Sequence, residues 1–366
     1  KAGLIMAPVR IGIIGSGAVA QVQHLPNLAA LKDLYTVEMV CDLSPSQARI
    51  VAEEYHVPHH TGDWRELLAH DLDAVILCHT DPKTEIAVAA FEAGKHVFIE
   101  KPICFSLQEA DRIIAAQQAA GTVGLAAYMK VYDPAFELAA AEASAMAPIR
   151  FVQIHHLHTN NSHHLAHFRL LRTAEDDLPA AEVAKTRAAR EAAVHEAIGE
   201  VSDDIKGAFG HLSGSMIHDL YGLRAIMGVP ERVVSSEIWY DGWGISTILA
   251  YPGGARCAAT WVELKDVRDF KETLEICGDD RRVLLQYPTG FSRGILSTLE
   301  IQTLDADGEA ITQHPAVAWA SPFVRELQHF HACITQGETP RTPLTAARHD
   351  IALIIDIVKA YLERSS

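Results

Sequence analysis

The chain has 366 residues, of which 49% are hydrophobic and 21% charged, and its formal net charge at pH 7 is −16. This composition is typical of a folded globular protein with two domains, and it excludes an intrinsically disordered chain. The negative charge disfavours nucleic acid and anionic lipid surfaces as partners, because both repel an acidic protein. We therefore expect the ligand to be a neutral or weakly charged small molecule.

Cysteine usage and hydropathy indicate where the protein works. The six cysteines lie apart along the chain without a CxxC pair, which predicts free thiols and a cytoplasmic location. No stretch approaches the roughly 20 apolar residues of a membrane span, and no secretory signal precedes the first apolar run. We therefore expect no membrane partner.

Short apolar runs alternate with helix-like segments through the first third of the chain. The pattern predicts buried strands at residues 9–14, 36–41, 73–78 and 96–99. Strands that alternate with helices indicate a parallel sheet with helices on both faces. The predicted fold class is therefore α/β, with an N-terminal doubly wound Rossmann domain over residues 6–130. Residues 1–5, before the first methionine, are left out of this prediction.

The stretch GSGAVA directly follows the first predicted strand and opens a helix. In this context Gly15 permits the tight turn, Gly17 lets the backbone approach a pyrophosphate, and the helix N-terminus binds phosphate. Asp42 ends the next strand, where its carboxylate accepts from ribose hydroxyls and repels a 2′-phosphate. The pattern favours NAD over NADP. The predicted contacts from these two segments are Gly15, Ser16, Gly17, Ala18, Val19 and Asp42.

Further motifs follow the fourth strand. Together with GSGAVA, the stretch AGKHVFIEKPIC resembles the Gfo/Idh/MocA family of dinucleotide-dependent sugar and cyclitol oxidoreductases. YMKVYDPAFE, residues 128–137, is similar to the segment that crosses between the family's domains, and GSMIHDLYGLRAIMG contains a counterpart of its catalytic histidine. RELQHFHACITQGETPRTPLTAARHDIALI resembles the family's C-terminal helix pair. The resemblance covers nearly the whole chain and is most specific in the first 135 residues.

The resemblance implies roles for two residues, Lys101 and His218. Lys101 lies just past the C-terminal end of a parallel strand, where ligands of α/β sheets bind, and its ammonium group can polarise a substrate hydroxyl. His218 would exchange the proton of that hydroxyl, since a histidine titrates near neutral pH. The family pattern also implies cofactor contacts by His79, Thr80, Glu100 and Lys101.

The sequence departs from the family pattern around His218. Gly214 stands where the family has an aspartate, four residues before the histidine, and Tyr221 stands where it often has another. Tyr221 and Ser215 share a helical face with His218 and are the candidates for part of the missing carboxylate's role. Asp219 points about 100° away on a helix and is not expected to be the partner. In the loop after the third strand, Cys78-His79-Thr80 replaces the family's Thr-Pro-Asn, and Lys83 replaces a histidine.

The rest of the chain, residues 131–366, is predicted to be an α+β domain with a large, open, mostly antiparallel sheet. Strand patterns occur at residues 151–158, 231–238, 245–251, 256–262, 272–277 and 282–286. An open apolar sheet face needs covering, which favours a homo-oligomer, a dimer or a tetramer. A helical insertion at about 174–206 should hold one helix of about twenty residues, with Asp177 as its cap. This helix is either a lid over the substrate pocket or an oligomer contact or solvated face.

Six histidines occupy residues 155–168, HHLHTNNSHHLAHF. His156 and His158 share one face of a strand, and His163 and His167 are neighbours if that end is helical. The run contains no carboxylate, so no metal is predicted and a polyhydroxylated substrate is the preferred ligand. The predicted substrate contacts are Lys101, Tyr128, Lys130, His158, Asn160, Asn161, His163, Ser215, His218 and Tyr221.

Three functions remain open from the sequence. The first is an NAD-dependent dehydrogenase that acts on a secondary hydroxyl of a sugar, glycoside or cyclitol. The second is an NAD-dependent glycosidase or lyase that oxidises its substrate transiently and eliminates a group without net redox change. The third is a non-catalytic dinucleotide-binding sensor, against which the presence of both Lys101 and His218 argues.

Overall fold

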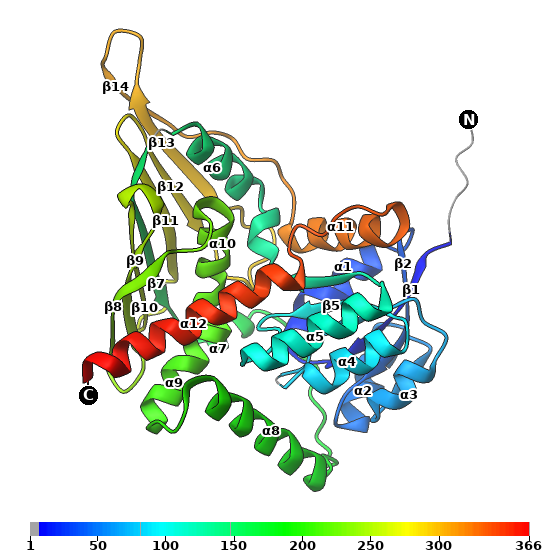
Figure 1. Ribbon diagram of the computed structural model, residues 1–366. Helices are drawn as coiled ribbons and strands as arrows, with labels where there is room; N and C mark the ends of the chain where they lie inside the picture. Colours follow the sequence, from blue (N-terminus) through cyan, green and yellow to red (C-terminus); the bar gives the residue numbers. More distant parts are fainter. Residues whose placement is uncertain (1–6, 81, 147, 366) are drawn as a thin grey trace, which may run out of the picture. The chain divides into compact units, whose positions relative to one another are not determined.

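The chain divides into two units in a computed structural model that describes residues 7–80, 82–146 and 148–365 (Figure 1). Unit 1 runs to Ala127 and regains residues 168–196 and 323–348, and unit 2 holds the remainder. The first division lies close to the predicted boundary at residue 130. The sequence prediction places the two later segments in the second domain, whereas they group with unit 1 here. Met6, the predicted start of the first domain, lies outside the described residues.

Unit 1 is built on a six-stranded parallel sheet. Its strand order is β3-β2-β1-β4-β5-β6, and every neighbouring pair is parallel. The four predicted strands are present as β1 (Val9–Ile14), β2 (Tyr35–Cys41), β4 (Ala74–Leu77) and β5 (His96–Glu100). The edge strands β3 (His59–Thr61) and β6 (Gly124–Ala127) were missed, because they are short and β6 lacks β-branched residues. The doubly wound Rossmann prediction is confirmed.

The helices of unit 1 lie between these strands in the chain or follow the last of them. The first spans residues 18–30 and includes a π-helical turn, η1 (Ala20–His24), before α1 (Leu25–Ala30). The others are α2 (Pro45–Glu54), α3 (Trp64–Ala69), α4 (Thr84–Glu92), α5 (Leu107–Ala120), α8 (Ala180–Ile198), α11 (Pro322–Gln336) and the first turn of α12 (Leu344–Ser365). Ser106 and Glu109 form a reciprocal capping box at the start of α5.

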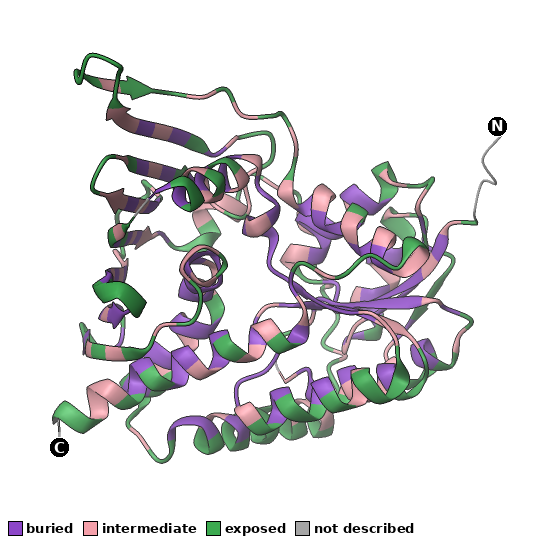
Figure 2. Ribbon diagram, turned by 45° about the horizontal axis from the view of Figure 1, so that its top comes forward, coloured by how far each residue is buried: buried purple, intermediate pink, exposed green. Residues whose placement is uncertain are grey.

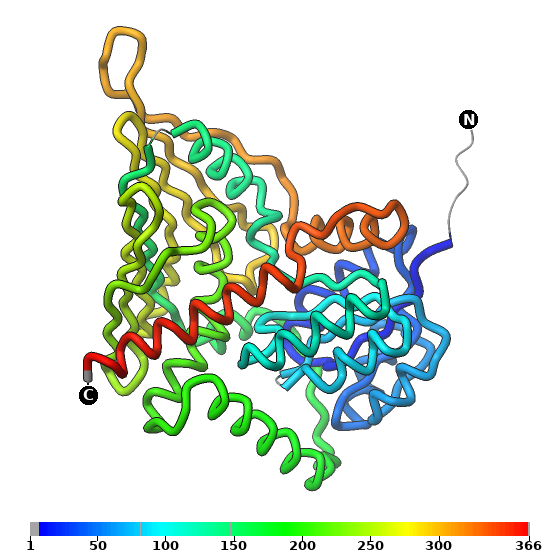
Figure 3. Tube along the Cα trace, viewed as in Figure 1, coloured from blue at the N-terminus to red at the C-terminus, as the bar shows by residue number. Residues whose placement is uncertain are grey.

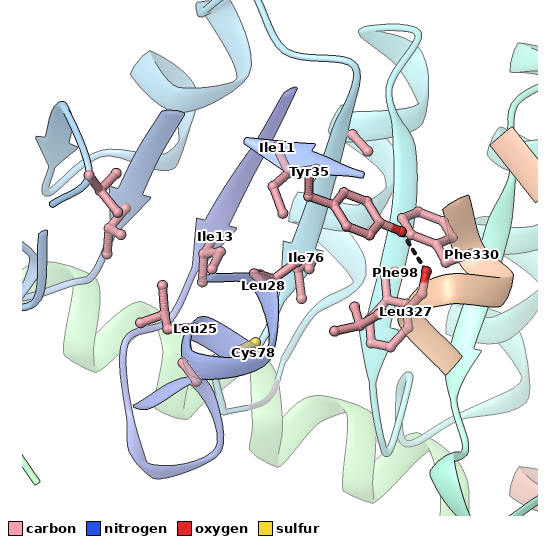
Figure 4. Close-up of a cluster of buried hydrophobic side chains, with 14 of the residues drawn as sticks. Ile11, Ile13, Leu25, Leu28, Tyr35, Ile76, Cys78, Phe98, Leu327 and Phe330 are labelled. Atoms are coloured by element: carbon pink, nitrogen blue, oxygen red, sulfur yellow. Dashed lines mark hydrogen bonds between the residues drawn. The ribbon is translucent and has the colours of Figure 1, made fainter. Parts of the chain in front are cut away.

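Helix α11 belongs to unit 1 because its apolar side completes that unit's core. Leu327 and Phe330 are fully buried against strand and helix residues that include Ile76 and Phe98 (Figure 4). The Tyr35 hydroxyl donates a hydrogen bond of 2.6 Å to the Leu327 carbonyl. The trace of this late segment accordingly lies beside the first strands of the chain (Figure 3).

Unit 2 contains an eight-stranded sheet in the order β14-β13-β12-β11-β7-β10-β9-β8. The strands are β7 (Ile149–His158), β8 (Arg232–Trp239), β9 (Gly244–Ala250), β10 (Arg256–Glu263), β11 (Lys271–Gly278), β12 (Arg282–Tyr287), β13 (Thr298–Leu304) and β14 (Ala310–Gln313). Only β7 and β10 pair in parallel. The mostly antiparallel sheet is confirmed, with β13 and β14 as additional strands.

Helices α6 (Pro134–Ala145) and α10 (Ile217–Met227) lie on one face of this sheet (Figure 1). A continuous helical stretch runs from α9 (Asp203–His211) through a π-helical turn, η3 (Leu212–Met216), into α10. The remaining short helices of unit 2 are η2 (Met129–Tyr132), α7 (Asn161–Leu165) and η4 (Pro252–Gly254). The opposite sheet face mixes polar and half-exposed residues such as Gln153, His155 and Thr260. This sheet face is less apolar than the sequence analysis expected. The homo-oligomer that was inferred from an apolar face therefore stays a prediction.

The predicted insertion helix is present as α8, nineteen residues long and largely exposed (Figure 2). It packs on unit 1, where Lys185 pairs with Glu85 and Glu196 accepts from the Ser106 hydroxyl. Asp177 does not cap it, contrary to the prediction. Its carboxylate instead accepts from the Ser46 amide at 2.8 Å and from the Ser44 hydroxyl, at the start of α2. No helix in the described part of the chain is long and apolar enough to span a bilayer.

Candidate functional site

The loop after β1 makes a turn that only glycine adopts easily. Gly15 has φ of +92°, and a Cβ there would lie 2.3 Å from the His79 backbone nitrogen. Its amide donates to the Cys41 carbonyl at 2.8 Å, which ties the end of β1 to the end of β2. Gly17, in contrast, has no atom within 4 Å of its Cβ position. The backbone of Gly17 is therefore open to a ligand on that side.

Asp42 is held against this loop at the end of β2. Its Oδ2 accepts from both the amide and the hydroxyl of Ser16 at 2.8 Å, and its Oδ1 from the Ser44 amide at 3.2 Å. Ala18 and Val19 begin the helix that follows. An open glycine backbone, a helix N-terminus and an anchored carboxylate fit the phosphates and ribose of a dinucleotide.

Segment 168–178 returns to the same edge of unit 1, which the sequence did not indicate. The Leu171 amide donates to the Gln21 side chain at 2.8 Å, and the Thr173 amide donates to the Gln47 side chain at 2.9 Å. The Thr173 hydroxyl also lies 2.7 Å from that of Ser46. Segment 168–178 is thus hydrogen-bonded to the helices that follow β1 and β2.

The Glu100-Lys101-Pro102 loop is fixed by buried groups. Burial raises the pKa of Glu100, but the His24 imidazole, 2.7 Å away, together with the charges of Lys101 and Lys83 outweighs burial and lowers that pKa. The Glu100 carboxylate also accepts from the Lys101 amide at 3.2 Å. Lys83, which the sequence marked only as a departure, is buried and donates to the Pro102 carbonyl at 3.1 Å.

Four predicted cofactor-binding segments meet at one edge of unit 1. Three of these residues directly follow the carboxyl end of a strand: Gly15 follows β1, Asp42 follows β2 and Lys101 follows β5. His79 is the second residue after β4. In a parallel sheet these ends share an edge. Thr80 is exposed there, and Lys101 is half-buried. Glu100 is directed to His24 and the Lys101 amide, so it orients the loop.

In unit 2, one row of buried side chains crosses the sheet. The strand register aligns Trp261 of β10, His156 of β7, Glu272 of β11 and Tyr287 of β12 as successive neighbours. All four are at most 5% exposed. Neighbours in register point to the same face, so the row forms one polar and aromatic layer beneath the helices.

The polar members of this row form an ion-pair network with two residues from the covering segments. His156 Nδ1 lies 2.7 Å from Asp219 Oδ2 and 3.9 Å from Glu272 Oε1. The Lys130 ammonium contacts the Glu272 carboxylate and lies 4.4 Å from the centre of the Tyr287 ring. Burial lowers the pKa of His156 despite the attraction of Asp219. As expected, Asp219 is not the partner of His218.

The ligand atoms of His156, Asp219 and Glu272 lie within 4.8 Å of one another, the one such group found among the described residues. The Lys130 ammonium already supplies positive charge to Glu272. We therefore interpret the group as an ion-pair network rather than a metal centre. Of the histidine run, it includes only His156. Helix α7 ends at Leu165, before His167, so the second predicted histidine pair is not on a helix.

His218 is paired with a tyrosine. Its Nδ1 lies 2.9 Å from the Tyr221 hydroxyl, which accepts from the Lys130 amide at 3.2 Å. The Tyr221 ring stacks on Tyr128 with ring centres 4.0 Å apart, and both rings are fully buried. Ser215, the other candidate partner, instead accepts from the Trp261 indole at 2.9 Å.

Unit 2 also contains a cavity of about 320 Å³. Its lining residues are His158, Asn160, Asn161, Gly210, His211, Gly214, Ser215, Trp243, Trp261 and Glu263. Four predicted substrate contacts, His158, Asn160, Asn161 and Ser215, lie together there, whereas His163 does not line it. Lys130, Tyr128 and Tyr221 are buried and are not among the lining residues.

The prediction from sequence did not include the aromatic residues that line this cavity. The His211 ring lies between Trp243 and Trp261, with ring centres 4.3 and 4.7 Å away. The alternation Trp261-Val-Glu263 at the end of a strand places both side chains on the face of His158, and this signal was present in the sequence. Nothing local pointed to Trp243, which comes from a turn.

These features define a two-unit protein with a dinucleotide-binding Rossmann sheet and a polar cavity in the second unit. Residues 9–128 match the family model GFO_IDH_MocA, described as an oxidoreductase family with an NAD-binding Rossmann fold. The resemblance predicted from GSGAVA and the Glu-Lys-Pro motif is thereby confirmed. Over these residues the chain is similar to the Gfo/Idh/MocA family of oxidoreductases.

Curated relatives match about a third of the chain. The YrbE oxidoreductase of Bacillus subtilis is 30% identical over 128 residues, 34% of this chain and 37% of its own length. An inositol 2-dehydrogenase/D-chiro-inositol 3-dehydrogenase of Shouchella clausii is 37% identical over 116 residues, 31% of this chain and 33% of its own. The chain thus matches about a third of the length of these relatives.

Solved structures with the same fold extend over the whole chain. An oxidoreductase of Desulfitobacterium hafniense described as NADPH-dependent has a TM-score of 0.77 at 16% identity, covering 98% of this chain and 97% of its own. A UDP-N-acetylglucosamine 3-dehydrogenase of Acidithiobacillus ferrooxidans has a TM-score of 0.71 at 21% identity, covering 97% and 98%. These likenesses establish the fold of both units.

Proposed function

We propose that this protein is an NAD-dependent oxidoreductase that transfers hydride between nicotinamide and a secondary hydroxyl of a sugar, glycoside or cyclitol. One observation carries the proposal: Lys101 follows β5 at the same edge of unit 1 as the Gly15 turn and Asp42. A bound nicotinamide cofactor supplies the hydride acceptor or donor. The residues of the chain bind it, orient the substrate and exchange the proton.

Lys101 polarises the reacting oxygen in this proposal. The Glu100 carboxylate and the Lys83 ammonium hold the backbone on either side of it. The amine therefore works from a fixed loop, which lowers the reorganisation needed when negative charge develops on oxygen.

His218 exchanges the hydroxyl proton in this proposal. The Tyr221 hydroxyl, 2.9 Å from its Nδ1, replaces the carboxylate that the family pattern would provide. A hydroxyl can donate or accept, so it orients the ring without adding negative charge.

The choice of NAD rests on Asp42. Its carboxylate is anchored by Ser16 and Ser44, so it cannot move aside to admit a 2′-phosphate without losing three hydrogen bonds. A polyhydroxylated small molecule is the proposed substrate, since curated relatives of the matched segment include inositol dehydrogenases. A homo-oligomer is proposed from the open face of the unit 2 sheet.

The test combines both dinucleotides with a panel of inositols, sugars and glycosides, recording nicotinamide reduction and products. NADH formed in step with oxidised product supports the proposal. Reduction with NADP in preference to NAD contradicts the cofactor assignment. Tight NAD binding without product from any panel member supports the non-catalytic sensor instead.

A second candidate, transient oxidation followed by elimination, is favoured by one specific observation. The cavity of unit 2 contains acid–base groups, His158 and Glu263, besides those the dehydrogenase proposal uses. Oxidation of a ring carbon acidifies the neighbouring C–H, and a base there permits loss of a leaving group. Product formed without accumulation of NADH supports this candidate.

A further inference from the structure

Asp219, His156 and His158 form a hydrogen-bonded chain that leads from the buried layer of unit 2 to its cavity. Asp219 Oδ2 lies 2.7 Å from His156 Nδ1, and His156 Nε2 lies 3.3 Å from His158 Nδ1. Asp219 and His156 are buried, whereas His158 is half-buried and lines the cavity. The chain joins residues from β7 and α10.

The carboxylate fixes where the protons of both rings lie. The Asp219 carboxylate accepts, so His156 carries its proton on Nδ1 and presents the lone pair of Nε2. Burial lowers the pKa of His156, which keeps this ring neutral. His158 Nδ1 lies 3.3 Å from that lone pair and 3.4 Å from the Ser215 hydroxyl, and when it donates to His156 the lone pair of His158 lies on Nε2. In that tautomer, His158 Nε2 is the nitrogen that can act as a base.

Glu263 lies beside His158. The two residues are register partners on the parallel strands β7 and β10, so their side chains leave the sheet on the same face, and both line the cavity. Burial raises the pKa of Glu263. One wall of the cavity thus presents an oriented base next to a carboxyl group that retains its proton to higher pH than usual.

We propose that this cavity is an enolisation site for a cyclic polyhydroxylated ketone, in which His158 is the base and Glu263 the hydrogen-bond donor to the carbonyl oxygen. Asp219 and His156 are positioning residues that act through His158. The substrate class rests on the proposed function, because oxidation of a ring hydroxyl yields this kind of ketone.

The step moves one proton and no net electrons. The C–H bond next to the carbonyl breaks, its electron pair forms the C=C bond of the enolate, and the proton passes to His158 Nε2. The carbonyl π pair moves to oxygen, where the Glu263 carboxyl group donates a hydrogen bond. The imidazolium of His158 is stabilised because its Nδ1–H donates toward His156, whose other nitrogen faces the Asp219 carboxylate. Return of the proton regenerates the ketone.

The test follows hydrogen exchange at carbon with a supplied ketone. The full-length protein is incubated with 2-keto-myo-inositol in heavy water, with and without NAD, and deuterium at the carbons flanking the carbonyl is measured by NMR. The wild type should exchange these positions at least about 100-fold faster than buffer, the usual contribution of a positioned base. Exchange no faster than buffer overturns the proposal.

Variants assign the roles. His158→Asn should return exchange to within a few-fold of the buffer rate, and Asp219→Asn should lower it about 10- to 100-fold, as loss of an orienting partner does. Glu263→Gln, which keeps a donor, should lose less than Glu263→Ala. His155→Asn is the matched control, because His155 is on the same strand but its side chain leaves the opposite face.

Two further measurements distinguish a variant that fails to fold from one that folds but has lost the exchange activity. Thermal unfolding of each variant shows whether it is folded, and the half-exposed position of His158 keeps its variant informative if Asp219→Asn unfolds. Wild-type exchange that survives in folded His158→Asn, or that His155→Asn abolishes equally, overturns the assignment. Because the assay starts from a ketone, exchange without any nicotinamide reduction from polyols supports this site and contradicts the dehydrogenase proposal alone.

Discussion

The cofactor-binding edge of unit 1 and the polar layer of unit 2 differ in how they are assembled. In unit 1, Gly15, Asp42 and Lys101 each follow the end of a parallel strand, so the sheet brings them to one edge. In unit 2, His156 and Asp219 are 63 residues apart in sequence and meet across a helix–sheet interface. The first arrangement is encoded locally, and the second exists only after the unit has folded.

The comparison has an energetic side. In unit 1 the side chains of Asp42 and Lys101 are half-buried, so changes of these two residues should alter binding or turnover more than stability. The charged groups of unit 2 are buried and depend on one another, so single changes there should alter stability first.

The largest expected effect is on the buried pair of unit 2. Glu272→Gln leaves the Lys130 ammonium without its carboxylate in the interior, which should lower the free energy of unfolding by about 3–5 kcal/mol. Asp279→Asn, which breaks the exposed pair with Arg150, should leave it nearly unchanged. Urea denaturation of both variants measures the difference, and equal losses would contradict the contrast between the two units.

Lys101→Ala tests the corresponding residue of unit 1. Loss of the polarising ammonium should lower turnover by about 100- to 1000-fold. The affinity for NAD and the melting temperature should stay close to those of the wild type. The exposed Lys32→Ala serves as the control for loss of a lysine. Full activity of Lys101→Ala in steady-state assays would remove the catalytic assignment.

The two glycines of the cofactor loop should behave in opposite ways. Gly15→Ala forces a residue with a Cβ into φ of +92° and against the His79 backbone, at a cost of about 2 kcal/mol in stability. Gly17→Ala meets no atom within 4 Å, so its stability should hold while its methyl group obstructs the ligand. Thermal unfolding and calorimetric NAD titration separate the two effects. Weakened NAD binding without destabilisation in Gly15→Ala would contradict the turn interpretation.

Asp42→Ala should shift the preference between NAD and NADP by about tenfold, equivalent to about 1.4 kcal/mol, since one close charge opposes the 2′-phosphate. Titration with both dinucleotides measures the ratio of their dissociation constants. The variant also loses the contacts with Ser16, so the ratio, rather than either constant alone, is the informative quantity. An unchanged ratio would show that another group selects the cofactor.

The smallest expected effect is on stability, from a substitution of Glu326, and this effect depends on pH. It comes from α11, is fully buried, and within the described residues its carboxyl oxygens have no hydrogen-bond partner. Burial, and secondly the charge of Glu100, raises its pKa well above 4.5. The unfolded chain therefore releases this proton at lower pH than the native state, and this group lowers stability as pH rises above about 4.5.

Glu326→Gln removes that contribution. The variant should gain stability over the wild type, on the order of 1 kcal/mol, and the gain should grow as pH rises from 4.5 toward the native pKa of Glu326. Denaturation series at several pH values measure the gain, with the exposed Glu92→Gln as control. A gain that shrinks with rising pH would mean that Glu326 is ionised in the native protein.

The prediction from sequence succeeded where structure follows from neighbouring residues. The four strands of unit 1, the Gly15 turn and the order of motifs at the strand ends required only hydrophobic pattern and the geometry of a parallel sheet. The prediction for Asp177 was right that its carboxylate accepts hydrogen bonds at the start of a helix, but it named the wrong helix. The side chain caps α2, more than a hundred residues away in sequence, and not the helix that follows it.

The histidine run shows the same limit. Period-two alternation correctly placed His156 and His158 on one face, but it contained no sign that Asp219 and Glu272 would meet His156. Those contacts depend on the order of strands in the sheet and on the packing of α10. The assignment of α11 to unit 1 depends in the same way on which core its Leu327 and Phe330 complete.

The sequence by itself determined the cofactor-binding half of this protein, because a strand, a glycine turn and a helix specify their own geometry within a few residues. Only the tertiary structure decided which acid–base groups share the cavity of unit 2. His158, Glu263 and Asp219 come from a strand, its neighbour in the sheet and a covering helix, and their proximity is a product of packing over long sequence separations. Long-range packing of this kind leaves no mark in any short stretch of the chain.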